Sequence, residues 1–164
     1  MKATKFFALL AVMMAFSFTF TACDSEATDG DVPTTEAEAR SMLLGQWKAA
    51  FGISLLHAKA YDEYYRVVTP SELTIIGHVM NSWGDESDKY APYAGQYVLH
   101  HKYPIVRINI DNTDPTKGTI TYQKDGVDTA LNFERLTSTS VVFTDDANLR
   151  SSKITDKKIT YVNK

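Results

Sequence analysis

From residue 46 onward, hydrophobic and polar residues alternate in short runs, the pattern of strands that bury one face. In the run GTITYQK at 118–124, Ile120 and Tyr122 share one face and the threonines share the other. Nine such runs are rich in Val, Ile, Thr and Tyr: 46–51, 64–69, 73–79, 95–102, 105–110, 118–124, 127–136, 140–144 and 158–163. Turns of Pro, Asp and Gly separate several of them. Eight or nine antiparallel strands in this length predict an all-β barrel or sandwich.

A short helix is expected just before the first strand. Thr35 and Glu38 have the spacing of a capping box, residues 42–44 supply an apolar face, and Gly45 fits a C-terminal stop. The segment 54–65 fits either a short helix or an irregular loop, and its pattern does not choose between them.

The first 23 residues contain only two charges, Lys2 and Lys5, followed by an apolar run of 17 residues from Phe6 to Ala22. A positive start, an apolar core and small residues before a cleavage point indicate a secretory signal peptide at 1–22. The run is at the lower limit of length for a membrane-spanning helix.

The run ends in Phe20-Thr21-Ala22-Cys23, which resembles the lipobox of bacterial lipoproteins. Cys23 is the single cysteine of the chain, and an unpaired cysteine in a secreted protein needs an explanation. The resemblance implies that Cys23 becomes the first residue and carries acyl chains such as palmitate. Each buried CH₂ contributes about 0.8 kcal/mol, so several chains would anchor the protein stably in the outer membrane.

Residues 23–38 are almost without apolar side chains after Cys23, so we expect a lipidated, flexible tether there and a domain over 39–164. Asp24, Glu26, Asp29 and Asp31 look like the surface-export signals of lipoproteins from the Bacteroidetes, which favours the cell surface over the periplasmic face; an ordinary solvated linker explains them as well. Residues 1–22 hold two of the 17 Lys and Arg and none of the 20 Asp and Glu, so the remainder has a net charge of −5. This balance argues against nucleic acid as a partner.

A short helix followed by Gly45-x-Trp47 and an antiparallel meander resembles the lipocalins, and more closely the small lipocalin-like lipoproteins of the Bacteroidetes. The resemblance implies a single barrel of about eight strands, in which the glycine bends the chain and the tryptophan closes the base. Lipocalins also place an arginine over this tryptophan, a role that would fall to Arg150. The interior would be lined by residues such as Val68, Ile75, Leu99, Ile108 and Phe133.

Motifs of catalysis are lacking, so we expect a protein that is not an enzyme and uses no cofactor or metal. His100 and His101 are adjacent on a strand and so should point to opposite faces, which makes them poor ligands of one metal ion. His78 could approach one of them across neighbouring strands, and His57 fits a surface position.

The stretch 81–97 carries Trp83, Tyr90, Tyr93 and Tyr97 among polar residues. Trp83 and Tyr93 are candidates for contact with a ligand, and Tyr97 is expected to cover the core. The favoured function is the binding of a small hydrophobic molecule inside a monomeric, lipid-anchored barrel. The alternative is a structural or interaction lipoprotein that engages a protein or glycan through the aromatic loop 81–97.

Overall fold

The computed structural model describes residues 30–50, 61–80, 90–144 and 149–163. The predicted signal peptide, Cys23, Trp83 and His57 lie outside these residues. The elements are α2 (Glu36–Leu43), β1 (Gly45–Ala49), β2 (Tyr61–Val68), β3 (Glu72–Val79), the 3-10 helix η2 (Ala91–Tyr93), β4 (Tyr97–Ile110), β5 (Gly118–Lys124), β6 (Val127–Glu134), β7 (Ser140–Thr144) and β8 (Leu149–Ile154).

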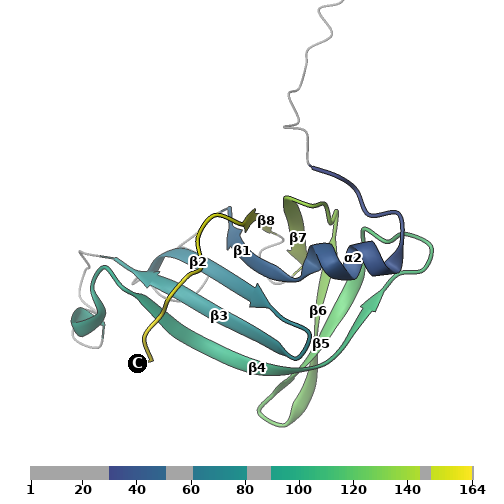
Figure 1. Ribbon diagram of the computed structural model, residues 1–164. Coiled ribbons are helices and arrows are strands. Elements are labelled where there is room, and N and C mark those ends of the chain that lie inside the picture. The colour runs from purple at the N-terminus through teal and green to yellow at the C-terminus, as the bar shows by residue number, and fades with distance from the viewer. Residues whose placement is uncertain (1–29, 51–60, 81–89, 145–148, 164) are drawn as a thin grey trace, which may run out of the picture.

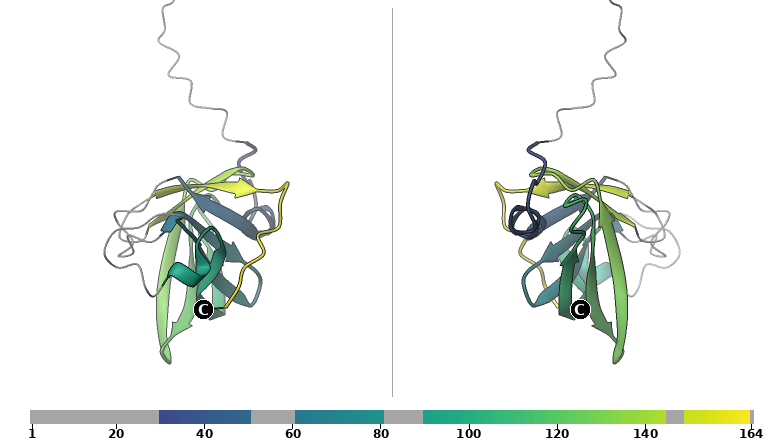
Figure 2. Two further views of the ribbon diagram at one scale, coloured as in Figure 1. Left: turned by 90° about the vertical axis from the view of Figure 1, so that its left-hand side faces the viewer. Right: turned by 90° about the vertical axis from the view of Figure 1, so that its right-hand side faces the viewer.

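The strands form a closed antiparallel barrel, as the sequence predicts. Each of the eight strands in the described residues pairs with the next along the chain, and β8 pairs back with β1. The ribbon in Figure 1 places α2 and η2 at opposite ends of the molecule, and the turned views in Figure 2 show the strands wrapped around a common interior. Closure leaves no sheet edge between the first and last strands.

Helix α2 begins at Glu36, inside the segment 23–38 that is expected to be a tether. Thr35 is its N-cap and accepts a hydrogen bond of 3.2 Å from the Glu38 backbone N–H. The Glu38 carboxylate, however, accepts from the backbone N–H and hydroxyl of Thr34, both at 2.8 Å, rather than from Thr35. The capping box is therefore present with its return contact moved by one residue.

The residues just before α2 are also part of the domain. Asp31 donates its N–H to the Ser138 hydroxyl at 2.9 Å and accepts from the Ser138 N–H at 2.8 Å. Pro33 is buried. The chain thus already contacts the barrel at Asp31, before the expected domain start at residue 39.

Gly45 bends the chain from the helix into the barrel. The helix ends at Leu43 with Leu44 as its C-cap, so Gly45 directly follows the cap, the position expected of a helix stop, and is also the first residue of β1. Its φ of 132° lies in the region that favours glycine. A Cβ atom here would also come within 3.1 Å of the Lys153 side chain. Both observations explain why the bend requires glycine.

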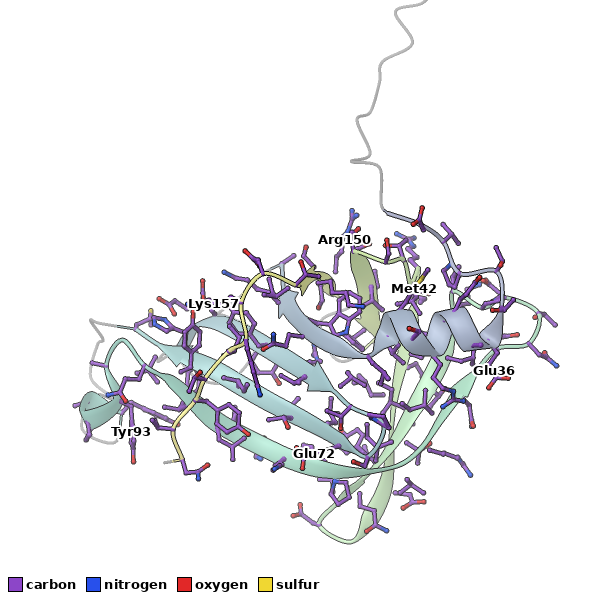
Figure 3. The ribbon with its side chains drawn as sticks, viewed as in Figure 1. Glu36, Met42, Glu72, Tyr93, Arg150 and Lys157 are labelled. Carbon is purple, nitrogen blue, oxygen red and sulfur yellow. The ribbon has the colours of Figure 1, made fainter. Side chains whose placement is uncertain are left out.

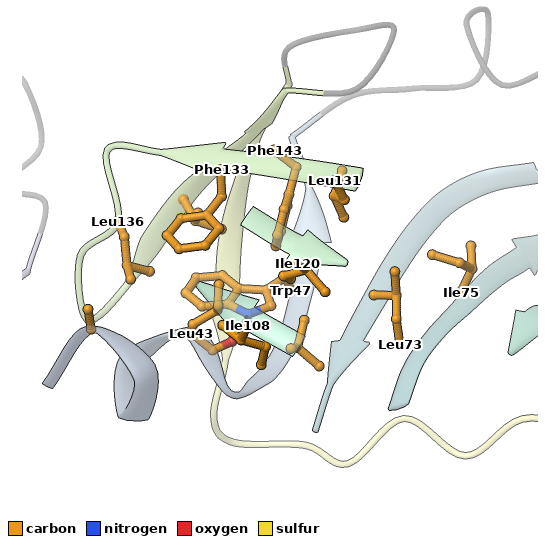
Figure 4. Packing of buried hydrophobic residues seen from close by; sticks show 13 residues of the cluster. Leu43, Trp47, Leu73, Ile75, Ile108, Ile120, Leu131, Phe133, Leu136 and Phe143 are labelled. Carbon is orange, nitrogen blue, oxygen red and sulfur yellow. Dashed lines mark hydrogen bonds between the residues drawn. The ribbon is translucent and has the colours of Figure 1, made fainter. Parts of the chain in front are cut away.

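Trp47 is fully buried at the end of the barrel next to α2. Its indole N–H donates to the Leu43 carbonyl at 2.8 Å, and its ring meets Phe143 edge-on with centroids 6.4 Å apart. Figure 4 shows these side chains grouped together with Phe133, while Leu73 and Ile75 lie further along the interior. Trp47 therefore joins the helix to the core of the barrel, consistent with its expected structural role.

One long strand, β4 (Tyr97–Ile110), forms where the sequence predicts two strands, at 95–102 and 105–110. Its first half pairs with β3 and its second half pairs with β5, and the exchange of partners falls at Pro104, opposite Glu72, and Ile105, opposite Tyr122. Register shifts interrupt the ladders near Leu99–His101 and at Ile105–Arg107. Such bulges bend a strand, and Pro104 has no N–H to donate.

The last strand of the barrel differs from the prediction. Sequence places it at 158–163, whereas β8 spans Leu149–Ile154. The C-terminal tail (residues 155–163) instead crosses the outside of β2, β3 and β4, as the yellow trace in Figure 1 shows. Val162 forms a parallel bridge with Val98. Ile159 is buried against Tyr65 and Ile76 on this outer face.

Candidate ligand-binding site

The strand registers fix which side chains face the barrel interior. Trp47 lies opposite Arg66, Arg66 lies opposite Ile75, and Ile75 lies opposite His101. On the other side of the barrel, Ile120 lies opposite both Ile108 and Leu131. Register partners on neighbouring strands point to the same face of a sheet. Since Trp47 is buried inside the barrel, Arg66, Ile75 and His101 also face the interior.

Six rings form a continuous row along the inner wall, which we call the aromatic row. They are Tyr90, Tyr61, His100, His101, Tyr103 and Tyr122, with successive centroid distances of 5.5, 5.8, 4.1, 5.3 and 4.9 Å. Gly77 makes room for it, because a Cβ there would lie 2.5 Å from the Tyr61 ring. The row begins beside η2, the end of the barrel opposite α2.

Part of the aromatic row is accessible to solvent, whereas the end of the barrel that holds Trp47 is fully buried. Tyr103 and Tyr122 are half-buried and pack against the main core, and His101 is exposed although it faces Ile75. Trp47, Phe143 and Leu136 at the other end are each fully buried. An inward-facing ring that solvent reaches is one that a bound molecule can also reach.

Three tyrosines of the row, Tyr61, Tyr103 and Tyr122, have raised pKa values. Burial raises the pKa of Tyr61, and the neighbouring Tyr90 raises it further. Burial likewise raises the pKa values of Tyr103 and Tyr122; for Tyr122 the nearby Arg66 charge acts in the opposite direction. These three rings therefore present neutral hydroxyl groups at physiological pH.

Arg66 is a buried cation in the interior that sequence reasoning did not single out. It is 5% exposed, and its guanidinium lies 4.9 Å from the Phe143 ring centroid and 5.2 Å from that of Tyr64. Burial lowers its pKa. The signal was present in YYRVV, where alternation puts Arg66 on the same face as Tyr64 and Val68.

The cation over Trp47 is Lys153, not Arg150. The Lys153 Nζ atom lies 5.2 Å from the indole centroid and donates to the Met42 carbonyl at 2.6 Å. Burial lowers the Lys153 pKa. Lys153 is the register partner of Trp47 and shares its face. Arg150 is an odd number of residues away, which places it on the opposite, exposed side of β8.

The expectation that His100 and His101 point to opposite faces is wrong. Their rings stack at 4.1 Å because the register shift beside them adds a residue to β4. His78 does not approach them. It lies on the outer face, where its Nδ1 is 2.5 Å from the Asp62 carboxylate. Among the described residues, no group of three or more His, Cys, Asp and Glu is placed to hold a metal ion.

The described part of 81–97 packs against the barrel. Tyr93 lies on η2 and, with Tyr90, covers a cluster of Tyr61, Val79 and Val98. Tyr97 faces outward and packs with Tyr65, as expected of a ring that covers a core. Of the two candidate ligand contacts, Tyr93 is thus a half-buried packing residue, and Trp83 falls outside the described residues.

Four of the five residues expected to line the interior do so. Val68, Ile75, Ile108 and Phe133 belong to the main core. Leu99 does not, because the same register shift places it opposite Ile76 on the outer face. The shift cannot be predicted from the sequence. A regular alternation can place either Leu99 or a histidine on the inner face.

Searches against protein-family models, curated proteins and solved structures found no match for this chain. No helix in the described part of the chain has the length and apolar content to cross a membrane. The class of protein defined here is a closed eight-stranded antiparallel barrel with a short N-terminal helix and an aromatic inner wall.

Proposed function

We propose that this protein is a lipocalin-like lipoprotein, held at the outer membrane by acyl chains on Cys23, that binds a small hydrophobic molecule inside its barrel without catalysing a reaction. The lipobox-like sequence before Cys23 supports the anchor. The glycine bend at Gly45 and the buried Trp47 beside a short helix support the likeness to lipocalins.

The aromatic row is the single observation that carries the binding proposal. It gives the interior an aromatic wall next to aliphatic side chains such as Ile75, the register partner of His101, and Leu131. Aromatic faces gain from stacking beyond the area that they bury. A flat or chain-like apolar molecule would therefore be held against the row.

One buried hydroxyl supports a ligand with a polar group in this proposal. Ser151 faces inward between Ala49 and Val141 and is completely buried. Within the described residues, its Oγ atom has no hydrogen-bond partner. A bound molecule with one hydrogen-bonding group would satisfy it, since buried polar groups in proteins are generally paired.

A pair of neighbouring substitutions tests this proposal. Thr129 faces inward opposite Tyr122, whereas Ala130, next to it on β6, is exposed. In a titration of the full chain with a fluorescent fatty acid, Thr129→Trp should weaken binding at least about tenfold, because the added rings occupy the interior. Ala130→Trp adds the same side chain outside and should bind like the parent.

Two results would contradict the proposal. The parent could fail to bind any fluorescent fatty acid or apolar dye, or Thr129→Trp and Ala130→Trp could bind alike. The first result would argue for a filled barrel, and the second would place binding outside the interior.

A further inference from the structure

A cavity lies outside the barrel, under the C-terminal tail. Its volume is about 430 Å³, within the range of about 300–1,000 Å³ typical of small-molecule sites. Gln46, Val67, Glu72 and Thr74 form its barrel side, on the outward face of β1, β2 and β3. The tail supplies the other side.

The tail is fixed over this cavity by specific contacts. The Gln46 side-chain amide donates to the Lys157 carbonyl at 2.9 Å and accepts from the Ile159 N–H at 2.7 Å. The Val162 N–H donates to the Tyr97 carbonyl at 2.9 Å. Figure 3 shows Lys157 on the tail and Glu72 on the strand beneath it. The cavity walls are thus built by the fold.

The lining combines an apolar side with a polar one. Val67, Ile159 and Tyr161 form the apolar side, and Tyr161 is its one aromatic ring. Hydroxyl groups of Thr69, Thr74 and Thr155 contribute to the polar side, together with the charged groups of Glu72 and Lys158. The hydroxyl groups of Thr69 and Thr74 already bond to Glu72. An alkyl chain would cover the Thr155 hydroxyl and the Lys158 ammonium without bonding them, which is costly. The lining fits a ring with an apolar face and hydroxyl groups at its edge.

The charges in the lining favour an acidic ligand. The Glu72 carboxylate is neutralised by Lys102, whose Nζ lies 2.9 Å from it, and accepts a hydrogen bond from the Thr74 hydroxyl at 3.0 Å. The Lys158 side chain makes no hydrogen bond or ion pair in the described part of the chain. The cavity therefore carries one positive charge that a ligand anion can pair with.

We propose that this outer cavity binds one ring of an acidic saccharide, a hexuronate. The apolar face of the sugar ring lies on Tyr161, its hydroxyl groups donate to Glu72, and its carboxylate pairs with Lys158. Each contact uses a different residue of the lining, so each contact can be removed by a separate substitution.

The test is a titration of the ¹⁵N-labelled full chain in detergent, followed by NMR. Sodium glucuronate should shift the amide signals of residues 155–161 saturably, with a Kd on the order of 1 mM, as for a ligand of this size. Glucose should bind about fivefold more weakly, because it lacks the carboxylate, and sodium acetate should cause no saturable shift.

Three variants separate the contacts. Tyr161→Ala should weaken glucuronate binding about tenfold, whereas Tyr161→Phe retains it. Lys158→Gln should reduce glucuronate to the affinity of glucose. Lys157→Gln is the matched control and should bind like the parent, because the Lys157 ammonium lies 5.7 Å from the Tyr97 ring instead of in the cavity.

Any of three outcomes would overturn the inference: no saturable shift with glucuronate, equal shifts with acetate, or unchanged binding by Tyr161→Ala. Thr129→Trp should leave glucuronate binding intact, because Thr129 is inside the barrel. Failure of the interior site and failure of the outer site are therefore distinguishable.

Discussion

The indole N–H of Trp47 donates to the Leu43 carbonyl at 2.8 Å, so the last turn of α2 and the first strand of the barrel are closed onto each other. This bond satisfies both a buried indole and a carbonyl that the end of a helix leaves without an intrahelical partner. Trp47 is thereby a structural residue at the base of the interior, away from the accessible part of the aromatic row.

Removal of this ring should be costly. Trp47→Ala is expected to lower the free energy of unfolding by about 3–5 kcal/mol, the usual cost of deleting a large buried aromatic side chain. Urea denaturation measures it. Val127→Ala, at a side chain that is 65% exposed, is the control and should change stability by less than about 0.5 kcal/mol. A Trp47→Ala variant as stable as the parent would refute the closed base.

The two cations of β8 should behave differently. Lys153→Ala removes a charge-assisted hydrogen bond to the Met42 carbonyl and the contact with Trp47, so we expect a loss of about 1–2 kcal/mol in unfolding free energy. Arg150→Ala, at an exposed position on the other face, should cost less than half as much. Thermal or urea unfolding of the two variants decides between them; the reverse order would contradict the assigned register.

Gly118 should not tolerate a side chain. A Cβ there would lie 2.3 Å from the Asn109 carbonyl oxygen and 2.5 Å from the Phe133 ring, so Gly118→Ala should destabilise the barrel by about 1–3 kcal/mol. Gly126, in the β5–β6 turn, has φ of 80° and nothing within 4 Å of its Cβ position. Gly126→Asn should be nearly neutral, because Asn accepts this conformation. Equal losses in denaturation experiments would count against the close strand packing.

Acid should weaken the contact of Lys48 on β1 with Glu63 on β2, which lies on the outer face of the barrel. Burial tends to raise the Glu63 pKa, but the hydrogen bonds from Lys48 and Tyr65 and the Lys48 charge outweigh it, so the pKa lies below its ordinary 4.5. A lowered carboxyl pKa adds stability above the unfolded value, and that stability is lost as pH falls through the folded value.

Glu63→Gln should therefore be less stable than the parent at pH 7, and the difference should shrink below about pH 4.5 as the parent also becomes protonated. Urea denaturation between pH 7 and pH 3 measures it. Asp156→Asn also removes a carboxylate, at an exposed position on the tail, and should be about as stable as the parent at pH 7. A difference that stays constant down to pH 3 would contradict the proposed pKa shift.

Membrane attachment should depend on one residue. Cys23→Ser removes the thiol that acyl chains require, so the variant should move from the membrane fraction to the soluble fraction. Incorporation of labelled palmitate should be lost together with it. Attachment that persists in Cys23→Ser would argue that residues 1–22 hold the protein in the membrane.

The sequence predicts best where structure depends on local pattern. The strands β5 and β7 have the predicted bounds, and Asp125 and Gly126 adopt positive φ values of 53° and 80° in the Asp-Gly turn between β5 and β6. Trp47 could be assigned to the core because it follows a glycine at the start of an alternating run. These features need no knowledge of distant partners.

Features set by distant partners could not be predicted. The bulge in β4 turns Leu99 outward and brings His100 and His101 together, yet it depends on the pairing with β3. The strand β8, LRSSKI, has no hydrophobic alternation because its inward positions include Ser151 and Lys153. Its place in the barrel comes from closure between β7 and β1, which the local pattern does not encode.

The central claim is that the barrel interior binds a small hydrophobic molecule. Native mass spectrometry of the full chain, purified from membranes in mild detergent, tests it most directly. The parent and Ala130→Trp should carry the same additional small-molecule mass, and Thr129→Trp should lack it. A parent protein without added mass that also fails to take up a fluorescent fatty acid, or an adduct that survives Thr129→Trp, would contradict the account.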